Sequence, residues 1–135
     1  MALLNWNDSL SVGVPTMDQQ HRRLVELTNQ LYDAMGTGKG DEIKSAVLRD
    51  LLTYAQVHFA AEERLMQKHA YPHFASHKVL HDELTDQVLQ LKQKLDAGQM
   101  VASVTLANFL KDWLQQHITQ EDRKYGRFIC QTAAV

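Results

Sequence analysis

Cysteine, proline and glycine are all scarce in this sequence of 135 residues. The single cysteine, Cys130, excludes a disulfide framework and suits a reducing compartment, so we expect a cytoplasmic protein. The two prolines and six glycines are few, and they cluster. Long stretches of chain are therefore free of helix breakers, which favours long uninterrupted helices.

Neither sign of charge dominates, and no long apolar run occurs. The 14 Lys and Arg residues nearly balance the 16 Asp and Glu residues, which gives a formal net charge of −2 and a pI of about 6.4. This balance argues against nucleic acid or an anionic membrane surface as a partner. The first residues carry no basic segment, and no apolar run of about 20 residues is present, so we expect neither a signal peptide nor a membrane span.

The bulk composition is that of a globular protein. Hydrophobic residues make up 44% of the chain and charged residues 22%. A chain of 135 residues is long enough to bury a core. We therefore expect a single domain over residues 1–135.

Apolar residues recur at spacings of three and four along most of the chain. After an extended arm over residues 1–16, this periodicity predicts four helices, at about 17–35, 41–69, 72–97 and 101–128. A frayed tail is expected beyond the fourth. Four amphipathic helices with short connections indicate an all-α, antiparallel up-down-up-down four-helix bundle.

Polar side chains interrupt the apolar stripe of every predicted helix. His58 and Glu62 lie one helical turn apart, so both leave the same face of the second helix. The other helices contribute His21, the pair His77 and His81, and the pair His117 and Asp122. An unpaired buried charge costs several kcal/mol or more, so these groups need partners.

These seven groups fall at similar heights in an antiparallel bundle. With a rise of about 1.5 Å per residue, their distances from the helix ends place them within about 5–10 Å along the bundle axis. A lone core histidine is more often a hydrogen-bonded core residue than a metal ligand, and a His–Glu pair is commonly a surface ion pair. Seven such groups in one layer favour a dinuclear metal site instead.

Neighbouring residues leave part of this assignment open. Glu121 lies four residues after His117 and competes with Asp122 for the carboxylate role. His117 and Asp122 are separated by roughly 140° around a regular helix, so geometry alone does not choose between them. His69 and His73 lie near helix ends, and we expect neither to be a ligand.

The donor set indicates the metal and the class of reaction. Imidazole suits several transition metals, bridging carboxylates suit paired iron or manganese, and no thiolate is present, so we expect two non-haem irons. Of about twelve coordination positions on two octahedral ions, five histidines, two bridging carboxylates and a bridging oxygen leave about one open. Five neutral donors against two carboxylates favour the reduced pair, and hence reversible O2 binding over oxygenase chemistry.

Five motifs follow one another across almost the whole chain. They are Ser11-Val-Gly-Val14, Asp18-Gln-Gln-His21, His58-x-x-x-Glu62, His77-x-x-x-His81 and His117-x-x-x-x-Asp122. In this order and at these separations, the sequence resembles the hemerythrin family, and within it the single-domain bacteriohemerythrins. No ligand position departs from the family pattern, and the resemblance selects Asp122 over Glu121.

The resemblance implies a role for each candidate residue. One iron would be held by His77, His81 and His117. The other would be held by His21 and His58. Glu62 and Asp122 would bridge the two irons together with an oxo or hydroxo group. O2 would bind at the two-histidine iron, in a pocket formed by Leu24, Phe59, Trp113 and Ile118. Ordinary core packing remains the alternative reading of the aromatic residues.

The resemblance implies an oxygen carrier or store rather than an enzyme. It would bind O2, could deliver it to an O2-consuming enzyme, and would act as a monomer. The alternatives are a di-iron enzyme, namely a ferroxidase, peroxidase or nitric-oxide reductase, and a sensor of O2 or iron.

Overall fold

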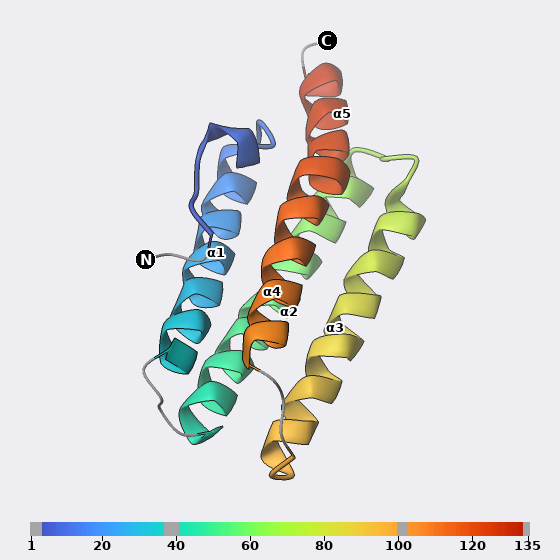
Figure 1. The fold of residues 1–135 in the computed structure, drawn as a ribbon. Coiled ribbons are helices and arrows are strands. Elements are labelled where there is room, and N and C mark those ends of the chain that lie inside the picture. Colours follow the sequence, from blue (N-terminus) through green and yellow to red (C-terminus); the bar gives the residue numbers. More distant parts are fainter. Residues whose placement is uncertain (1–3, 37–40, 100–102, 134–135) are drawn as a thin grey trace.

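The computed structural model describes residues 4–36, 41–99 and 103–133, which form an antiparallel four-helix bundle (Figure 1). Consecutive long helices run in opposite directions; α1 packs against α2 and α4, and α2 packs against α3. These helices are α1 (Pro15–Gly36), α2 (Asp41–Lys68), α3 (Phe74–Asp96) and α4 (Ser103–Gln116). The described residues contain no strand, so the predicted all-α class and topology are confirmed.

The fourth predicted helix is divided into three segments. After α4 the chain makes a π-helical turn, η2 (His117–Asp122), and continues as α5 (Arg123–Ala133) in the same direction. The prediction of a frayed tail beyond residue 128 is therefore wrong for residues 129–133. Of the break expected at residues 36–40, Gly36 belongs to α1 and residues 37–40 lie outside the described residues. None of the described helices is long and apolar enough to cross a bilayer.

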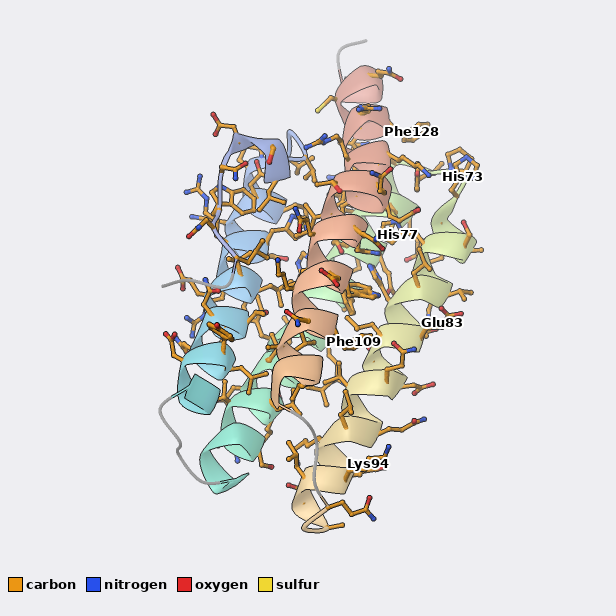
Figure 2. All side chains as sticks on the ribbon, viewed as in Figure 1. His73, His77, Glu83, Lys94, Phe109 and Phe128 are labelled. Carbon is orange, nitrogen blue, oxygen red and sulfur yellow. The ribbon has the colours of Figure 1, made fainter. Side chains whose placement is uncertain are left out.

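The predicted apolar stripes face the interior of the bundle. In α3 the buried side chains are His77, His81, Leu84, Val88 and Leu95, which recur at spacings of three, four and seven. Figure 2 shows Glu83 and Lys94 on the outer side of the same helix, where water solvates their charges. Gly98, at φ 78°, ends α3, and the N–H of Gln99 donates to the Lys94 carbonyl, as in a Schellman motif.

The N-terminal arm is fastened to the bundle by polar contacts. It contains one 3₁₀ turn, η1 (Asp8–Leu10), so it is not extended throughout. The carboxylate of Asp18 accepts hydrogen bonds from the Val12 N–H at 2.9 Å and the Ser11 hydroxyl at 2.6 Å. Asp18 therefore holds the arm on α1.

The arm crosses α5 at Gly126, where the two backbones touch. A Cβ atom added to Gly126 would lie 2.1 Å from the carbonyl oxygen of Val12, well inside van der Waals contact. Since that oxygen belongs to the backbone, only a shift of the arm could relieve the clash. Glycine is therefore required here for close packing.

We expect Gly126→Ala to destabilise the fold. Overpacking of this kind costs about 1–3 kcal/mol, so the midpoint of urea unfolding should fall. Arg127→Ala, at an exposed position of the same helix, is the matched control and should leave the midpoint nearly unchanged. Equal midpoints for the two variants would show that the arm moves aside freely.

Candidate metal centre

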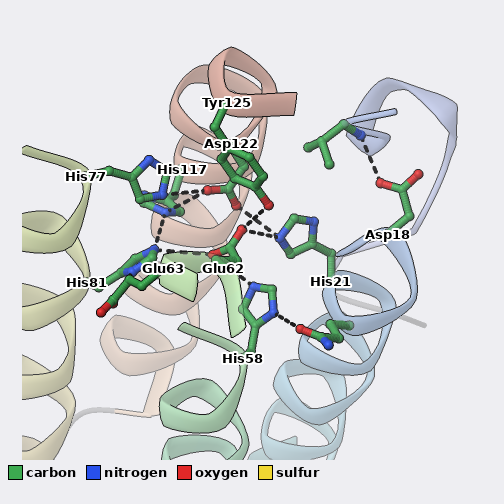
Figure 3. A network of polar contacts seen from close by, with 12 residues as sticks. Asp18, His21, His58, Glu62, Glu63, His77, His81, His117, Asp122 and Tyr125 are labelled. Atoms are coloured by element: carbon green, nitrogen blue, oxygen red, sulfur yellow. Dashed lines mark hydrogen bonds and ion pairs between the residues drawn. The ribbon is translucent and has the colours of Figure 1, made fainter. Parts of the chain in front are cut away.

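Seven polar side chains from α1, α2, α3 and η2 meet in the core of the bundle (Figure 3). They are the predicted seven: His21, His58, Glu62, His77, His81, His117 and Asp122. None is more than 5% exposed, so water cannot solvate the two carboxylates. The structure thus brings every predicted ligand into one buried layer.

The Asp122 carboxylate lies between two sets of imidazoles. Its Oδ1 atom is 3.0 Å from Nε2 of both His77 and His117. Its Oδ2 atom is 3.0 Å from Nε2 of His21, on the other side of the cluster. The two oxygens of one carboxylate therefore face different groups of histidines, which is the arrangement that a bridging ligand requires.

Glu62 lies across the same gap. Its Oε1 atom is 3.2 Å from Nε2 of His58 and 3.3 Å from Nε2 of His81, and its Oε2 atom is 3.3 Å from Nε2 of His21. The buried hydroxyl of Tyr125 donates a hydrogen bond to Oε2. This hydrogen bond restrains the rotation of the carboxylate.

The donor atoms fall into two groups that share both carboxylates. One group contains His77, His81 and His117, the other His21 and His58, and Glu62 and Asp122 belong to both. Within each group the donor atoms lie within 4.8 Å of one another. His69 and His73 belong to neither group. Each group could therefore hold a metal ion, and the two groups differ in their number of histidines.

The π-helical turn explains how His117 and Asp122 reach the same centre. The N–H of Arg123 donates to the carbonyl of Ile118, five residues earlier, so this turn is wider than an α-helical one. Residues five apart thereby come to the same side of the helix. The side chain of Glu121 is 35% exposed and its carboxylate lies 3.6 Å from Lys124. The structure thus places Asp122, and not Glu121, in the cluster.

Unpaired atoms in the cluster indicate cations at its centre. Nε2 of His77 and Oδ1 of Asp122 are buried and have no hydrogen-bond partner among the described residues, although they lie only 3.0 Å apart. Nε2 of His81 and Nε2 of His117 face each other at 3.2 Å. Because Nδ1–H of His81 is donated to Glu63, the neutral His81 ring carries its lone pair on the inward Nε2. Such converging lone pairs fit metal ions better than direct hydrogen bonds.

Protons take the place of cations in the metal-free chain. Burial disfavours the charged imidazolium, but the adjacent carboxylates of Asp122 and Glu62 outweigh it and raise the pKa of His21 to about 10. Likewise, burial opposes ionisation of Asp122, but His117 and His21 hold its pKa well below the usual range. The cluster therefore keeps its carboxylates ionised, and a bound metal would displace protons from histidine.

Two polar residues that the sequence analysis did not single out orient the histidines. Nδ1–H of His58 donates to the amide oxygen of Gln20 at 2.6 Å, and Nδ1–H of His81 donates to Glu63 at 2.9 Å. Each contact fixes the tautomer in which Nε2 carries the inward lone pair. In the sequence, these two residues are marked only by lying next to a ligand: Gln20 precedes His21, and Glu63 follows Glu62.

Aromatic rings cover the side of the cluster formed by His81 and His117. Phe59 stacks on His81 with ring centroids 3.9 Å apart, and Trp113 stacks on His117 at 4.3 Å. Both rings, together with Leu24, also line an apolar cavity of about 30 Å³. Ile118, the fourth predicted pocket residue, is buried but does not line this cavity.

A four-helix bundle with two histidine–carboxylate groups in its core is the architecture of a non-haem dinuclear metal protein. The family model described as "Hemerythrin HHE cation binding domain" matches residues 12–129. Bacteriohemerythrins of Stenotrophomonas maltophilia and Methylococcus capsulatus are each 36% identical to this chain over 93% of its length, covering 81% and 96% of those proteins. A solved structure of wild-type hemerythrin superimposes with a TM-score of 0.89 at 33% identity, over 95% of this chain and 98% of that one.

The chain belongs to the hemerythrin family. This is a family of O2-binding proteins that contain non-haem di-iron centres, and the cluster of histidines and carboxylates fits such a centre. The resemblance stated from the sequence motifs is thereby confirmed.

We expect Glu62→Ala to prevent assembly of an iron pair. The substitution removes a carboxylate that both groups share, so iron content should fall from about two to about one per chain or fewer. Iron determination after anaerobic loading measures this. Glu83→Ala, an exposed carboxylate on α3, is the control. A Glu62→Ala protein with a full complement of iron would disprove the sharing of Glu62.

Proposed function

We propose that this chain binds O2 reversibly at a di-iron centre and serves as an oxygen carrier or store. The observation that supports this most directly is the unequal division of the donors, three histidines on one side and two on the other, with Glu62 and Asp122 common to both. An octahedral ion on the two-histidine side is left with a position that the protein does not fill.

The ligand roles follow from the two donor groups. We assign His77, His81 and His117 to one iron and His21 and His58 to the other, with Glu62 and Asp122 as bridges. When bound, the iron pair supplies the electrons that O2 accepts and later returns. The hydroxyl of Tyr125 holds Glu62 in place, because burial and the neighbouring carboxylates keep the pKa of Tyr125 well above its usual value and so keep it a donor.

The apolar cavity provides the surroundings that reversible binding requires. Its volume of about 30 Å³ exceeds the roughly 10–15 Å³ needed for one water, so it has room for a diatomic molecule. Thr28 and Thr85 supply the only hydroxyls in its lining, and both donate to carbonyls of their own helices. No acidic side chain among the lining residues can protonate reduced oxygen and release it as peroxide.

An open surface depression reaches the cluster at His117. Its lining includes Leu80, Trp113 and His117, with Gln116, Gln120 and Glu121 at its polar side. In our assignment His117 belongs to the three-histidine iron, whose positions are filled by protein and bridging ligands. This opening therefore reaches the three-histidine group, where our assignment leaves no open position.

We further propose that residues 1–135 act as a single-domain monomer in the cytoplasm, with an O2-consuming enzyme as recipient. One cluster of buried apolar side chains runs from the arm through all the helices, which supports a single domain. The large exposed apolar side chains of the described residues, Tyr32, Val57, Val79 and Leu89, are scattered over the helices. Isolated apolar residues of this kind do not require a partner subunit.

Cycles of air and argon over the iron-loaded, reduced protein test the proposed function. We expect a visible charge-transfer band that develops under air, bleaches under argon and returns over several cycles. A single irreversible oxidation, or a band that decays as peroxide accumulates in solution, would refute the carrier role and favour a ferroxidase or peroxidase.

Trp113→Ala is expected to shorten the lifetime of the O2 adduct. Removal of the indole unstacks His117 and joins the cavity to the surface depression, because Trp113 lines both. Water would then reach the centre, and autoxidation followed at the visible band should accelerate several-fold. Trp113→Phe keeps a ring and should change the rate less. Equal autoxidation rates for the original chain and Trp113→Ala would show that the indole serves only packing.

A further inference from the structure

The hydrogen-bond acceptors Glu63 and Gln20 give the two histidine groups different surroundings. Glu63 accepts from Nδ1–H of His81, which belongs to the three-histidine group, while Gln20 accepts from Nδ1–H of His58, which belongs to the two-histidine group. The two contacts have the same geometry, a side-chain oxygen on the outer nitrogen of a buried imidazole. They differ in charge, because one acceptor is a carboxylate and the other an amide.

Local structure explains why each acceptor reaches its histidine. Glu63 directly follows Glu62 in α2, and its side chain crosses to His81 on α3 (Figure 3). Gln20 directly precedes His21 in α1 and reaches His58 on α2. The side chain of Glu63 is 19% exposed, and its carboxylate lies 2.9 Å from Nδ1 of His81. Each acceptor therefore links two helices as well as orienting a ring.

Acceptor charge changes what the imidazole gives to a metal. A carboxylate on the outer nitrogen draws the proton towards itself and makes the inner nitrogen a stronger donor, which stabilises the higher oxidation state of the metal. A neutral amide orients the ring without adding negative charge. The three-histidine group therefore contains an imidazole with a charged acceptor, and the two-histidine group contains one with a neutral acceptor.

We propose that Glu63 and Gln20 are positioning residues that make the two iron positions electronically unequal. Glu63, acting through His81, stabilises the oxidised form of the three-histidine iron, and Gln20, acting through His58, leaves the two-histidine iron easier to keep reduced. This inference rests on the di-iron site proposed above.

The midpoint potential of the iron-loaded protein, measured by anaerobic spectroelectrochemistry, tests the proposal. Glu63→Gln should raise the potential by the equivalent of about a tenfold change in the redox equilibrium, which is about 59 mV for one electron. Gln20→Glu should lower it by a similar amount. Glu83→Gln, the same chemical change at an exposed position of α3, should leave it unchanged. Potentials for Glu63→Gln and Gln20→Glu that match that of Glu83→Gln would overturn the proposal.

The double variant Gln20→Glu/Glu63→Gln distinguishes the effect of where the carboxylate lies from the effect of total charge. Its net charge equals that of the original chain, but the carboxylate now faces His58. We expect the half-oxidised protein to give a different electron paramagnetic resonance spectrum, because the ferric ion would be favoured on the other side. An unchanged spectrum would show that only total charge matters and would overturn the proposed inequality.

Zinc affinity provides a measurement that depends on neither iron nor O2. Glu63→Gln should weaken Zn²⁺ binding by about tenfold or more in calorimetry, since a hydrogen-bonded partner of a ligand typically contributes that much. If Glu63→Gln cannot retain iron, the potential of Gln20→Glu decides alone, and an unchanged value refutes the inference. Failure of reversible O2 binding in the original chain would refute the proposed function while leaving these potentials and affinities to be compared.

Discussion

Two carboxylates buried among five imidazoles are the constraint to which the rest of the bundle conforms. Glu62 and Asp122 are almost completely inaccessible, and an uncompensated buried carboxylate costs several kcal/mol. Their charge must be balanced by protons on histidine or by metal. The histidines come from α1, α2, α3 and η2, so every helical column of the bundle contributes. Balancing the charge thus holds the helices together, so metal binding and folding are coupled.

The helical periodicity of the continuous segment α4–η2–α5 is adjusted to the same constraint. Leu106, Leu110, Leu114, Ile118 and Asp122 are buried and follow one another at intervals of four. On a regular α-helix each such step drifts by about 40°, so the run could not stay inside the bundle. The wider turn at His117–Asp122 absorbs part of this drift and keeps α5 directed at the core. A repeated spacing of four was thus a signal of the π-helical turn.

The fold and the ligands could be predicted because both leave a signal in the pattern of polar and apolar residues. Apolar stripes define the helices, and histidines or carboxylates within those stripes stand out. Asp18, Gln20 and Glu63 could not be predicted in the same way, because they lie at partly exposed positions where a polar residue is ordinary. Only the packing of one helix on another decides that Glu63 meets His81 and that Gln20 meets His58.

The reversible O2 binding that we propose would make opposing demands on the surroundings of the site. The donors must be electron-rich enough for O2 to accept electrons, yet the cavity must offer no proton that would make the transfer irreversible. The structure separates these demands in space. Negative charge lies behind the imidazoles, at Glu63, and between them, at Glu62 and Asp122, whereas Leu24, Phe59 and Trp113 face the cavity. Because protons need a polar path and the acidic side chains do not line the cavity, this arrangement hinders protonation there.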